Sequence, residues 1–116
     1  MLAVIGTADK YFGTNLTRIV SEAGLRSIRT SKIERIIKEL KLPGHVAIID
    51  MNWEDVQAPG ILRQLVNIGR ITDNKVISVC PNQEEDLKKL ARNSRVSESF
   101  LRYDLETTFK EYLKNL

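Results

Sequence analysis

Apolar residues fall along this chain in two kinds of run. Three short runs are almost continuously apolar, at residues 2–6, 45–50 and 75–80. Continuous runs of this length are typical of strands that are buried on both faces of a parallel sheet. Residues 26–30 and 96–101 are weaker strand candidates, because their apolar content is lower. The pattern therefore predicts five strands.

Between these runs, apolar side chains recur every three or four residues, which predicts amphipathic helices. Gly24 sits where a helix C-terminal glycine belongs. Ser31 and Glu34 have the spacing of a capping box. Asn82 and Asp104 are polar residues suited to capping the later helices. The predicted helices are 15–23, 33–40, 61–68, 82–94 and 105–116.

Strands and helices alternate five times over residues 1–116. Such alternation predicts a doubly wound α/β domain, in which helices cover both faces of one parallel sheet. We expect a single domain, because 116 residues leave no room for a second core. In sheets of this kind, functional residues gather at the carboxyl ends of the strands. Here those ends carry residues 7–9, Asp50 and Cys80.

The composition indicates the cellular compartment in which we expect the protein. Cys80 is the only cysteine, so no internal disulfide can form, which is typical of a reducing compartment. No apolar stretch reaches the roughly 20 residues of a membrane span, and the first residues lack the pattern of a signal peptide. We therefore expect a cytoplasmic protein that does not engage a membrane.

The chain is mildly basic, with a net charge of +3, and its positive charge is concentrated in the segment 26–38. A nucleic-acid site normally adds interleaved aromatic residues or a reading motif, and this segment has neither. A solvated helix face is therefore the favoured interpretation, with a nucleic-acid site as an alternative.

Motifs of catalysis are missing from the sequence. The single histidine, His45, rules out a metal site built from several histidines, and there is no CxxC pair or phosphate-binding glycine loop. Without a nucleophile and base at a recognisable spacing, we do not expect an enzyme. Asp50 is the strongest functional candidate, because a carboxylate that ends a buried strand faces the cleft of such a fold.

The order of these features resembles the receiver domain of two-component response regulators over essentially the whole chain. The run 2–6 leads into a helix that ends at Gly24, and the third run ends in Asp50, where receivers carry the phosphoacceptor aspartate. The resemblance implies a flavodoxin-like (βα)5 fold with strand order 2-1-3-4-5. It also implies that Asp9, Asp50 and Cys80 converge at one end of the sheet.

Several residues depart from the receiver pattern at positions that support phosphorylation. Receivers hold Mg²⁺ with the acceptor aspartate, an acidic pair after the first strand and a backbone carbonyl, for which Asn52 is placed here. Thr7 and Ala8 replace the acidic pair, and only Asp9, one step later, is acidic. The other substitutions are Cys80 for the usual threonine or serine, and Arg102 or Tyr103 for the usual lysine.

Some of these candidates have structural roles as alternatives. Asp9 suits a turn or a helix cap as well as it suits a metal ligand. Cys80 fits a small buried apolar residue better than a redox sensor. Trp53 is placed to cover the cleft or to pack in the core, and we expect His45 in a loop at the opposite edge of the sheet.

The resemblance and its departures together favour a pseudo-receiver, a signalling domain that acts through protein–protein contact without metal-dependent phosphorylation. Such a domain needs no cofactor, and the expected partners are a histidine kinase, an effector domain or a second copy of the chain. Two alternatives stay open: a phosphoacceptor regulator that uses Asp50 and Mg²⁺, and a nucleic-acid-associated domain that uses residues 26–38. The predicted interaction face lies within residues 83–116, with the charged residues Arg92, Arg95, Arg102, Glu106 and Lys110.

Overall fold

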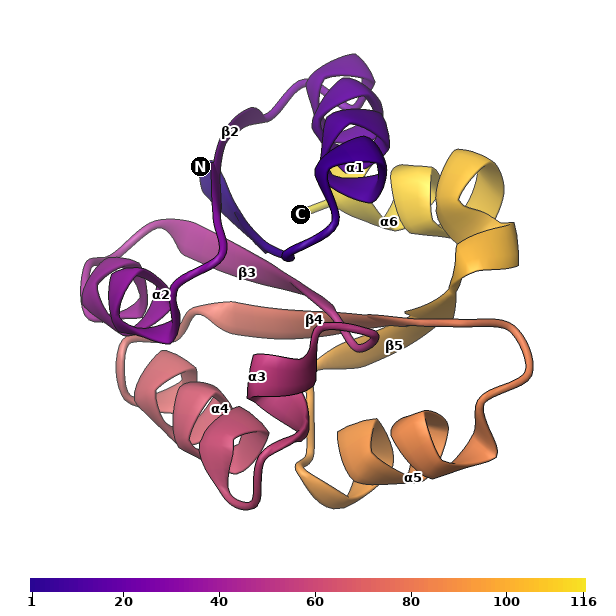
Figure 1. The fold of residues 1–116 in the computed structure, drawn as a ribbon. Coiled ribbons are helices and arrows are strands. Elements are labelled where there is room, and N and C mark those ends of the chain that lie inside the picture. The colour runs from indigo at the N-terminus through magenta and orange to yellow at the C-terminus, as the bar shows by residue number, and fades with distance from the viewer.

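A five-stranded parallel sheet forms the centre of the computed structural model, which describes residues 1–116 (Figure 1). The strand order is β2-β1-β3-β4-β5, so the predicted flavodoxin-like topology is confirmed. All four strand pairs are parallel, so every strand ends at the same edge of the sheet. The strands are β1 (Leu2–Gly6), β2 (Arg26–Thr30), β3 (His45–Asp50), β4 (Lys75–Cys80) and β5 (Glu98–Leu101).

Helices cover both faces of the sheet. Figure 1 shows α1 and α6 above it and α2, α3, α4 and α5 below it. The short helix α3 was not predicted. The last predicted helix, 105–116, is divided into a π-helical turn (Leu105–Phe109) and α6, and a 3₁₀ turn (Arg102–Asp104) precedes it. The helices are α1 (Lys10–Glu22), α2 (Ile33–Leu40), α3 (Glu54–Gln57), α4 (Ile61–Ile71), α5 (Glu85–Asn93) and α6 (Lys110–Lys114). None is long and apolar enough to cross a membrane.

Two separate cores explain why the strands are continuously apolar. Side chains of a strand alternate between the two faces of the sheet, so Ile48 enters the core under α1 and α6, whereas Ile49 enters the core under α2, α4 and α5. Both faces are covered, and a polar residue in either register would be buried. Trp53 belongs to the second core and is almost fully buried, which confirms its packing role.

Helix ends are where the sequence patterns were least informative. Gly24 has φ +90° after α1, as predicted for a C-terminal glycine. The capping box at Ser31 is wrong, because Lys32 occupies the N-cap of α2 and makes no side-chain cap bond. Asn82 does not cap α5, because its Oδ1 accepts from the backbone of Tyr103 instead. Asp104 likewise accepts from the backbone N–H of Leu101 and does not cap the final helix.

His45 begins β3 at the edge of the sheet opposite Asp50, and it is not the loop residue that we expected. Its Nε2 lies 3.2 Å from the carboxylate of Glu39, and its Nδ1 lies 2.9 Å from the carbonyl oxygen of Pro43. Both ring nitrogens therefore have partners within the fold, so His45 is a structural residue of this edge.

Candidate functional site

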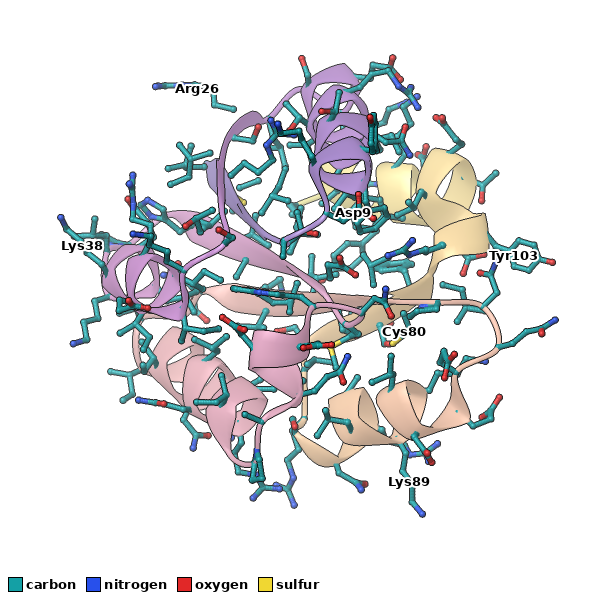
Figure 2. All side chains as sticks on the ribbon, in the orientation of Figure 1. Asp9, Arg26, Lys38, Cys80, Lys89 and Tyr103 are labelled. Carbon is teal, nitrogen blue, oxygen red and sulfur yellow. The ribbon has the colours of Figure 1, made fainter.

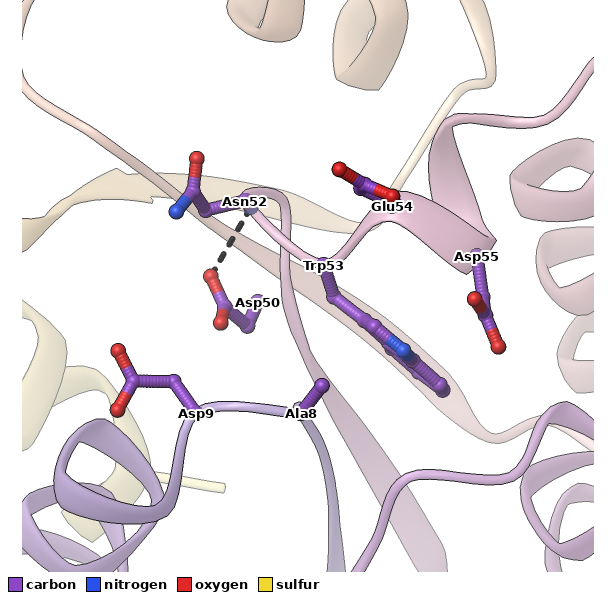
Figure 3. A pocket seen from close by; sticks show the side chains of 7 residues that line it. All are labelled: Ala8, Asp9, Asp50, Asn52, Trp53, Glu54 and Asp55. Atoms are coloured by element: carbon purple, nitrogen blue, oxygen red, sulfur yellow. Dashed lines mark hydrogen bonds between the residues drawn. The ribbon is translucent and has the colours of Figure 1, made fainter.

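A cavity of about 340 Å³ lies at the carboxyl ends of β1 and β3, where the predicted site residues were expected. The loop after β1 and the segment after β3 form its walls, and Figure 3 shows the carboxylates of Asp9 and Asp50 on the same side of it. Strand register places Asp50 beside Val79, one residue before Cys80, so the predicted convergence of these strand ends is confirmed. The lining residues are Ala8, Asp9, Asp50, Asn52, Trp53, Glu54 and Asp55.

Both oxygens of the Asp50 carboxylate are occupied by partners from this chain. The hydroxyl of Thr7 donates to Oδ2 at 2.7 Å, and the backbone N–H of Asn52 donates to Oδ1 at 3.0 Å (Figure 3). Arg102 adds a third bond, from Nη2 to Oδ1 at 3.2 Å. The side chain of Asp50 is only 2% exposed. A buried charge of this kind is stable only when it is paired and hydrogen-bonded, and these three donors supply both conditions.

Arg102 occupies the position facing Asp50, which resolves the choice between Arg102 and Tyr103 left by the sequence. Arg102 lies close to Asp50 because it directly follows β5, which ends beside the end of β4. Its guanidinium stacks on the ring of Phe12, 3.9 Å from the ring centroid. Its Nε is buried without an acceptor, so the contact with Asp50 uses one nitrogen only. Tyr103 points outward (Figure 2).

Asp9 is a helix cap in this structure. Its Oδ1 accepts from the backbone N–H groups of Tyr11 and Phe12, each at 3.0 Å, at the start of α1. A carboxylate in this position also interacts favourably with the helix dipole. One of its two oxygens is therefore already used, although the residue lines the cavity and is exposed.

Four carboxylates line the cavity, but Thr7 and Ala8, at the positions of the receiver's acidic pair, offer no anionic oxygen. Mg²⁺ prefers carboxylate ligands in a near-octahedral arrangement. The hydroxyl of Thr7 donates a hydrogen bond to Asp50, and the side chain of Ala8 is only a methyl group. Nowhere in the chain do three His, Cys, Asp or Glu side chains come together as a metal site would need. The loop after β1 therefore lacks the acidic pair that a phosphorylatable receiver uses to hold Mg²⁺.

Cys80 is fully buried and does not line the cavity. Its sulfur lies 3.9 Å from the hydroxyl of Ser99 on the neighbouring strand β5. Burial raises the pKa of the Cys80 thiol above its ordinary value, because desolvation disfavours the thiolate. A thiol of this kind is a poor nucleophile, so the structure agrees with Cys80 as a small core residue.

The predicted interaction face is divided among different surroundings, and its role in binding stays a prediction. Arg102 is held against Asp50, whereas Glu106 and Lys110 form ion pairs with α1. Arg92 lines a shallow cavity of about 430 Å³ along the outer edge of β5. Arg95 lines a different cavity, at the starts of β4 and β5.

The basic segment 26–38 lies on the opposite edge strand, β2, and on α2. Arg26 and Lys38 project away from the body of the protein (Figure 2). Two other cations are partly used within the fold, since Arg29 donates to the hydroxyl of Thr14 and Arg35 pairs with Glu39. This surface is a dispersed set of charges without an aromatic platform.

Three features of the site were missed by reasoning from the sequence. Phe12 supplies the platform for Arg102, and nothing in its local pattern distinguishes it from a core residue of α1. The sequence gave Thr7 only as a replacement for one residue of the acidic pair, whereas in the structure its hydroxyl donates to Asp50. The acidic residues Glu54 and Asp55 also line the cavity, and their proximity to Asp50 in sequence was the only available signal.

Comparison with known proteins shows the fold of receiver domains. No family model and no curated protein matches the sequence. A Burkholderia thailandensis protein named for pilus assembly (CpaE) is 16% identical with a TM-score of 0.76, covering 99% of this chain and 96% of that chain. A Colwellia psychrerythraea response regulator is 18% identical with a TM-score of 0.69, covering 98% and 96%. A Burkholderia pseudomallei response regulator, solved with a phosphorylated aspartic acid, calcium ion and citrate, is 8% identical with a TM-score of 0.69, covering 98% and 71%.

Proposed function

We propose that this chain, which has the fold of response-regulator receiver domains, is a signalling domain that acts through protein–protein contact without metal-dependent phosphorylation of Asp50. The observation that carries the proposal is the state of the Asp50 carboxylate. It accepts one hydrogen bond from Thr7, one from the backbone of Asn52 and one from Arg102. A carboxylate in this state is a structural anion.

The chemistry of phosphoryl transfer explains why these contacts oppose phosphorylation. A carboxylate that attacks a phosphodonor needs a free oxygen and a cation to offset the charge of the incoming group. Here Oδ2 is turned toward the hydroxyl of Thr7, and the positive charge of Arg102 already neutralises the resting carboxylate. The attack would break both contacts. Thr7 and Ala8 have no carboxylate that could hold a metal ion to offset the incoming charge.

A phosphoacceptor regulator is the second candidate, and the cavity beside Asp50 is the observation in its favour. The exposed carboxylates of Asp9, Glu54 and Asp55 line the same cavity, so a loosely held ion would have carboxylate oxygens as ligands. This candidate requires that Thr7 and Arg102 release Asp50 when the ion and the phosphodonor arrive.

The intact mass of the protein separates these two candidates. The chain is incubated with a small phosphodonor and millimolar Mg²⁺, with Asp50→Asn as the matched control. We expect no added phosphoryl group in either protein. A mass increase of one phosphoryl group in the wild type that is absent from Asp50→Asn would overturn the proposal and support the phosphoacceptor.

The outer edge of β5 is the surface that we propose for a protein partner. Edge strands expose unpaired backbone groups that a partner strand or loop can engage. The cavity along this edge is bordered by Lys88, Arg92, Glu98 and Asp104 around the apolar side chains of Val96, Phe100 and Leu101. Charges around an apolar centre give a partner both contact area and register.

Charge reversal tests this surface. Arg92→Glu changes the rim of the β5 edge, whereas Lys89→Glu changes an exposed charge on the same helix that does not border the cavity. Sedimentation equilibrium reports self-association, and co-purification with a histidine kinase or an effector domain reports the other partners. We expect Arg92→Glu alone to weaken the complex. Equal weakening by Lys89→Glu would argue against a defined contact at this edge.

A further inference from the structure

A second cavity, of about 210 Å³, lies at the edge of the sheet opposite Asp50. It lies where α4 and α5 end and where β4 and β5 begin. It shares no lining residue with the receiver-like site and only Ser97 with the cavity along the β5 edge. Its lining residues are Val66, Arg70, Asp73, Asn74, Lys75, Arg95 and Ser97.

We infer that this cavity binds a small divalent oxyanion, such as inorganic phosphate or the phosphoryl group of a small phosphomonoester. Three cations, Arg70, Lys75 and Arg95, line it, and Asp73 is the only acidic residue among the lining side chains. None of the three cations forms an ion pair within the fold, whereas the cations beside α1, α6 and Asp50 do. The lining therefore carries a net charge of +2, three cations minus one carboxylate.

Two of the residues that line this cavity have an unusual backbone conformation. Asp73 (φ 58°) and Arg95 (φ 62°) are the only residues other than glycine with a positive φ. Each directly follows the C-cap of a helix, a position that glycine occupies after α1, where Gly24 has φ +90°. Glycine is the least strained residue there. Both residues are charged and line one cavity. Backbone strain that is kept in such a place favours a role of these side chains in binding a ligand.

The free donors of the cavity fit an oxyanion. The amide group of Asn74 is already engaged, since its nitrogen donates to the carbonyl oxygens of Leu40 and Leu42. The hydroxyl of Ser97 accepts from the backbone N–H of Val76, so its proton stays available to donate. Two guanidinium groups, one ammonium group and this hydroxyl can therefore donate to a ligand, and guanidinium groups bind phosphate oxygens in a bidentate way.

Charge and size narrow the ligand further. A lining charge of +2 matches the dianion of a phosphomonoester better than a single carboxylate. The volume is below the roughly 300–1,000 Å³ typical of sites for drug-sized molecules. The cavity therefore accommodates a small ion, or the phosphoryl end of a ligand whose remainder stays in solvent.

Titration of the chain with inorganic phosphate, at constant ionic strength and without metal, tests this inference. Amide NMR signals of residues at the cavity, including Lys75 and Ser97, report binding. Arg95→Gly is the central variant, because glycine suits φ 62° and the fold should persist. Lys75→Gln is the second variant. Lys89→Gln removes one exposed positive charge outside the cavity and is the matched control.

We expect saturable shifts confined to the cavity, with phosphate affinity reduced about tenfold by Arg95→Gly and by Lys75→Gln, as for loss of one charged hydrogen bond. Lys89→Gln should bind like the wild type. Glycerol phosphate that binds more tightly than inorganic phosphate would identify a phosphomonoester as the preferred source of the oxyanion. The inference is overturned if phosphate causes no saturable shift, if acetate binds equally well, or if Lys89→Gln weakens binding as much as Arg95→Gly.

Discussion

Arg102 lies 3.2 Å from Asp50 although 52 residues separate them in the chain. The pair joins the turn after β5 to the end of β3 across the carboxyl edge of the sheet. Because Arg102 also stacks on Phe12 from α1, three elements that are distant in sequence meet at one carboxylate. This contact pairs the buried Asp50 carboxylate with a cation, and the first prediction follows from it.

Removing Arg102 should destabilise the fold more than removing an exposed arginine. Arg102→Met leaves the Asp50 carboxylate buried with two hydrogen bonds and no cation, which should cost about 2 kcal/mol of unfolding free energy. Arg92→Met, at an exposed position, should change it by less than about 0.5 kcal/mol. Urea denaturation measures both. A double-mutant cycle with Asp50→Asn that gives no coupling energy would show that the pair does not form in solution.

Thr7→Asp should make the stability of the protein depend on Mg²⁺. The substitution removes a donor to Asp50 and places a second carboxylate beside it, so the variant should be less stable than the wild type without metal. Mg²⁺ binding to the folded state would restore stability in proportion to its saturation. Thermal unfolding with and without millimolar Mg²⁺ measures the effect.

Thr7→Asn is the matched control for this experiment, because it has the shape of aspartate without the charge. The wild type and Thr7→Asn should show no Mg²⁺-dependent change in melting temperature. A shift of equal size in all three proteins would mean that Mg²⁺ acts elsewhere on the protein.

Asp9→Ala should lower the free energy of unfolding by about 1 kcal/mol, because α1 loses the side chain that accepts from the backbone N–H groups of Tyr11 and Phe12. Asp9→Ser should retain most of the stability, since a serine hydroxyl can also cap a helix. Urea denaturation distinguishes the two. If both variants are as stable as the wild type, the cap contributes nothing measurable and the exposed carboxylate has another purpose.

Acid should weaken the contact between α1 and α6. Hydrogen bonds from Lys110 and Arg18 lower the pKa of Glu22, and a hydrogen bond from Arg18 lowers the pKa of Glu106, each below the ordinary value of 4.5. Groups with a depressed pKa in the folded state stabilise it above the ordinary value, and that contribution is lost as the pH falls through the depressed pKa. The relevant window therefore lies below about pH 4.5.

The double variant Glu22→Gln/Glu106→Gln tests this dependence. It should be slightly less stable than the wild type at neutral pH, and the difference should disappear as the solution is acidified below pH 4.5. All four charged side chains of the cluster are exposed or half-buried, so added salt should also reduce the difference. Glu111→Gln, which alters an exposed carboxylate outside the cluster, should show neither effect.

Cys80 should resist thiol reagents in the native state. The thiol is fully buried, and burial raises its pKa, so both access and the thiolate fraction are low. Labelling by a maleimide should follow global unfolding and accelerate as urea is added. Rapid labelling of the native protein would indicate local opening of the β4–β5 edge.

The hydrophobic pattern by itself determined the architecture. Residues 46–49 have no polar side chain in either register, and that pattern is stable only in a sheet covered on both faces. Alternation with helices and the right-handed rule for parallel crossovers then leave few possible topologies. The position of Asp50 at the functional edge followed from the same reasoning, because the carboxyl ends of parallel strands meet there.

Local polar patterns were less reliable because one polar side chain can serve several partners. Ser31 and Asn82 both have the spacing of helix caps, yet the first is not used and the second bonds the backbone beyond β5. The competition between a local partner and a distant one is decided only when the chain is folded.

Tertiary structure alone decided the state of the site. The sequence left open whether Arg102 or Tyr103 takes the position of the receiver lysine, and it gave Thr7 only as a replacement for an acidic residue. Packing of β5 beside β4 brings Arg102 toward Asp50, and the loop after β1 aims the hydroxyl of Thr7 at the same carboxylate. These contacts depend on orientations and distances of a few ångströms between segments far apart in the chain, and periodicity carries no information about them.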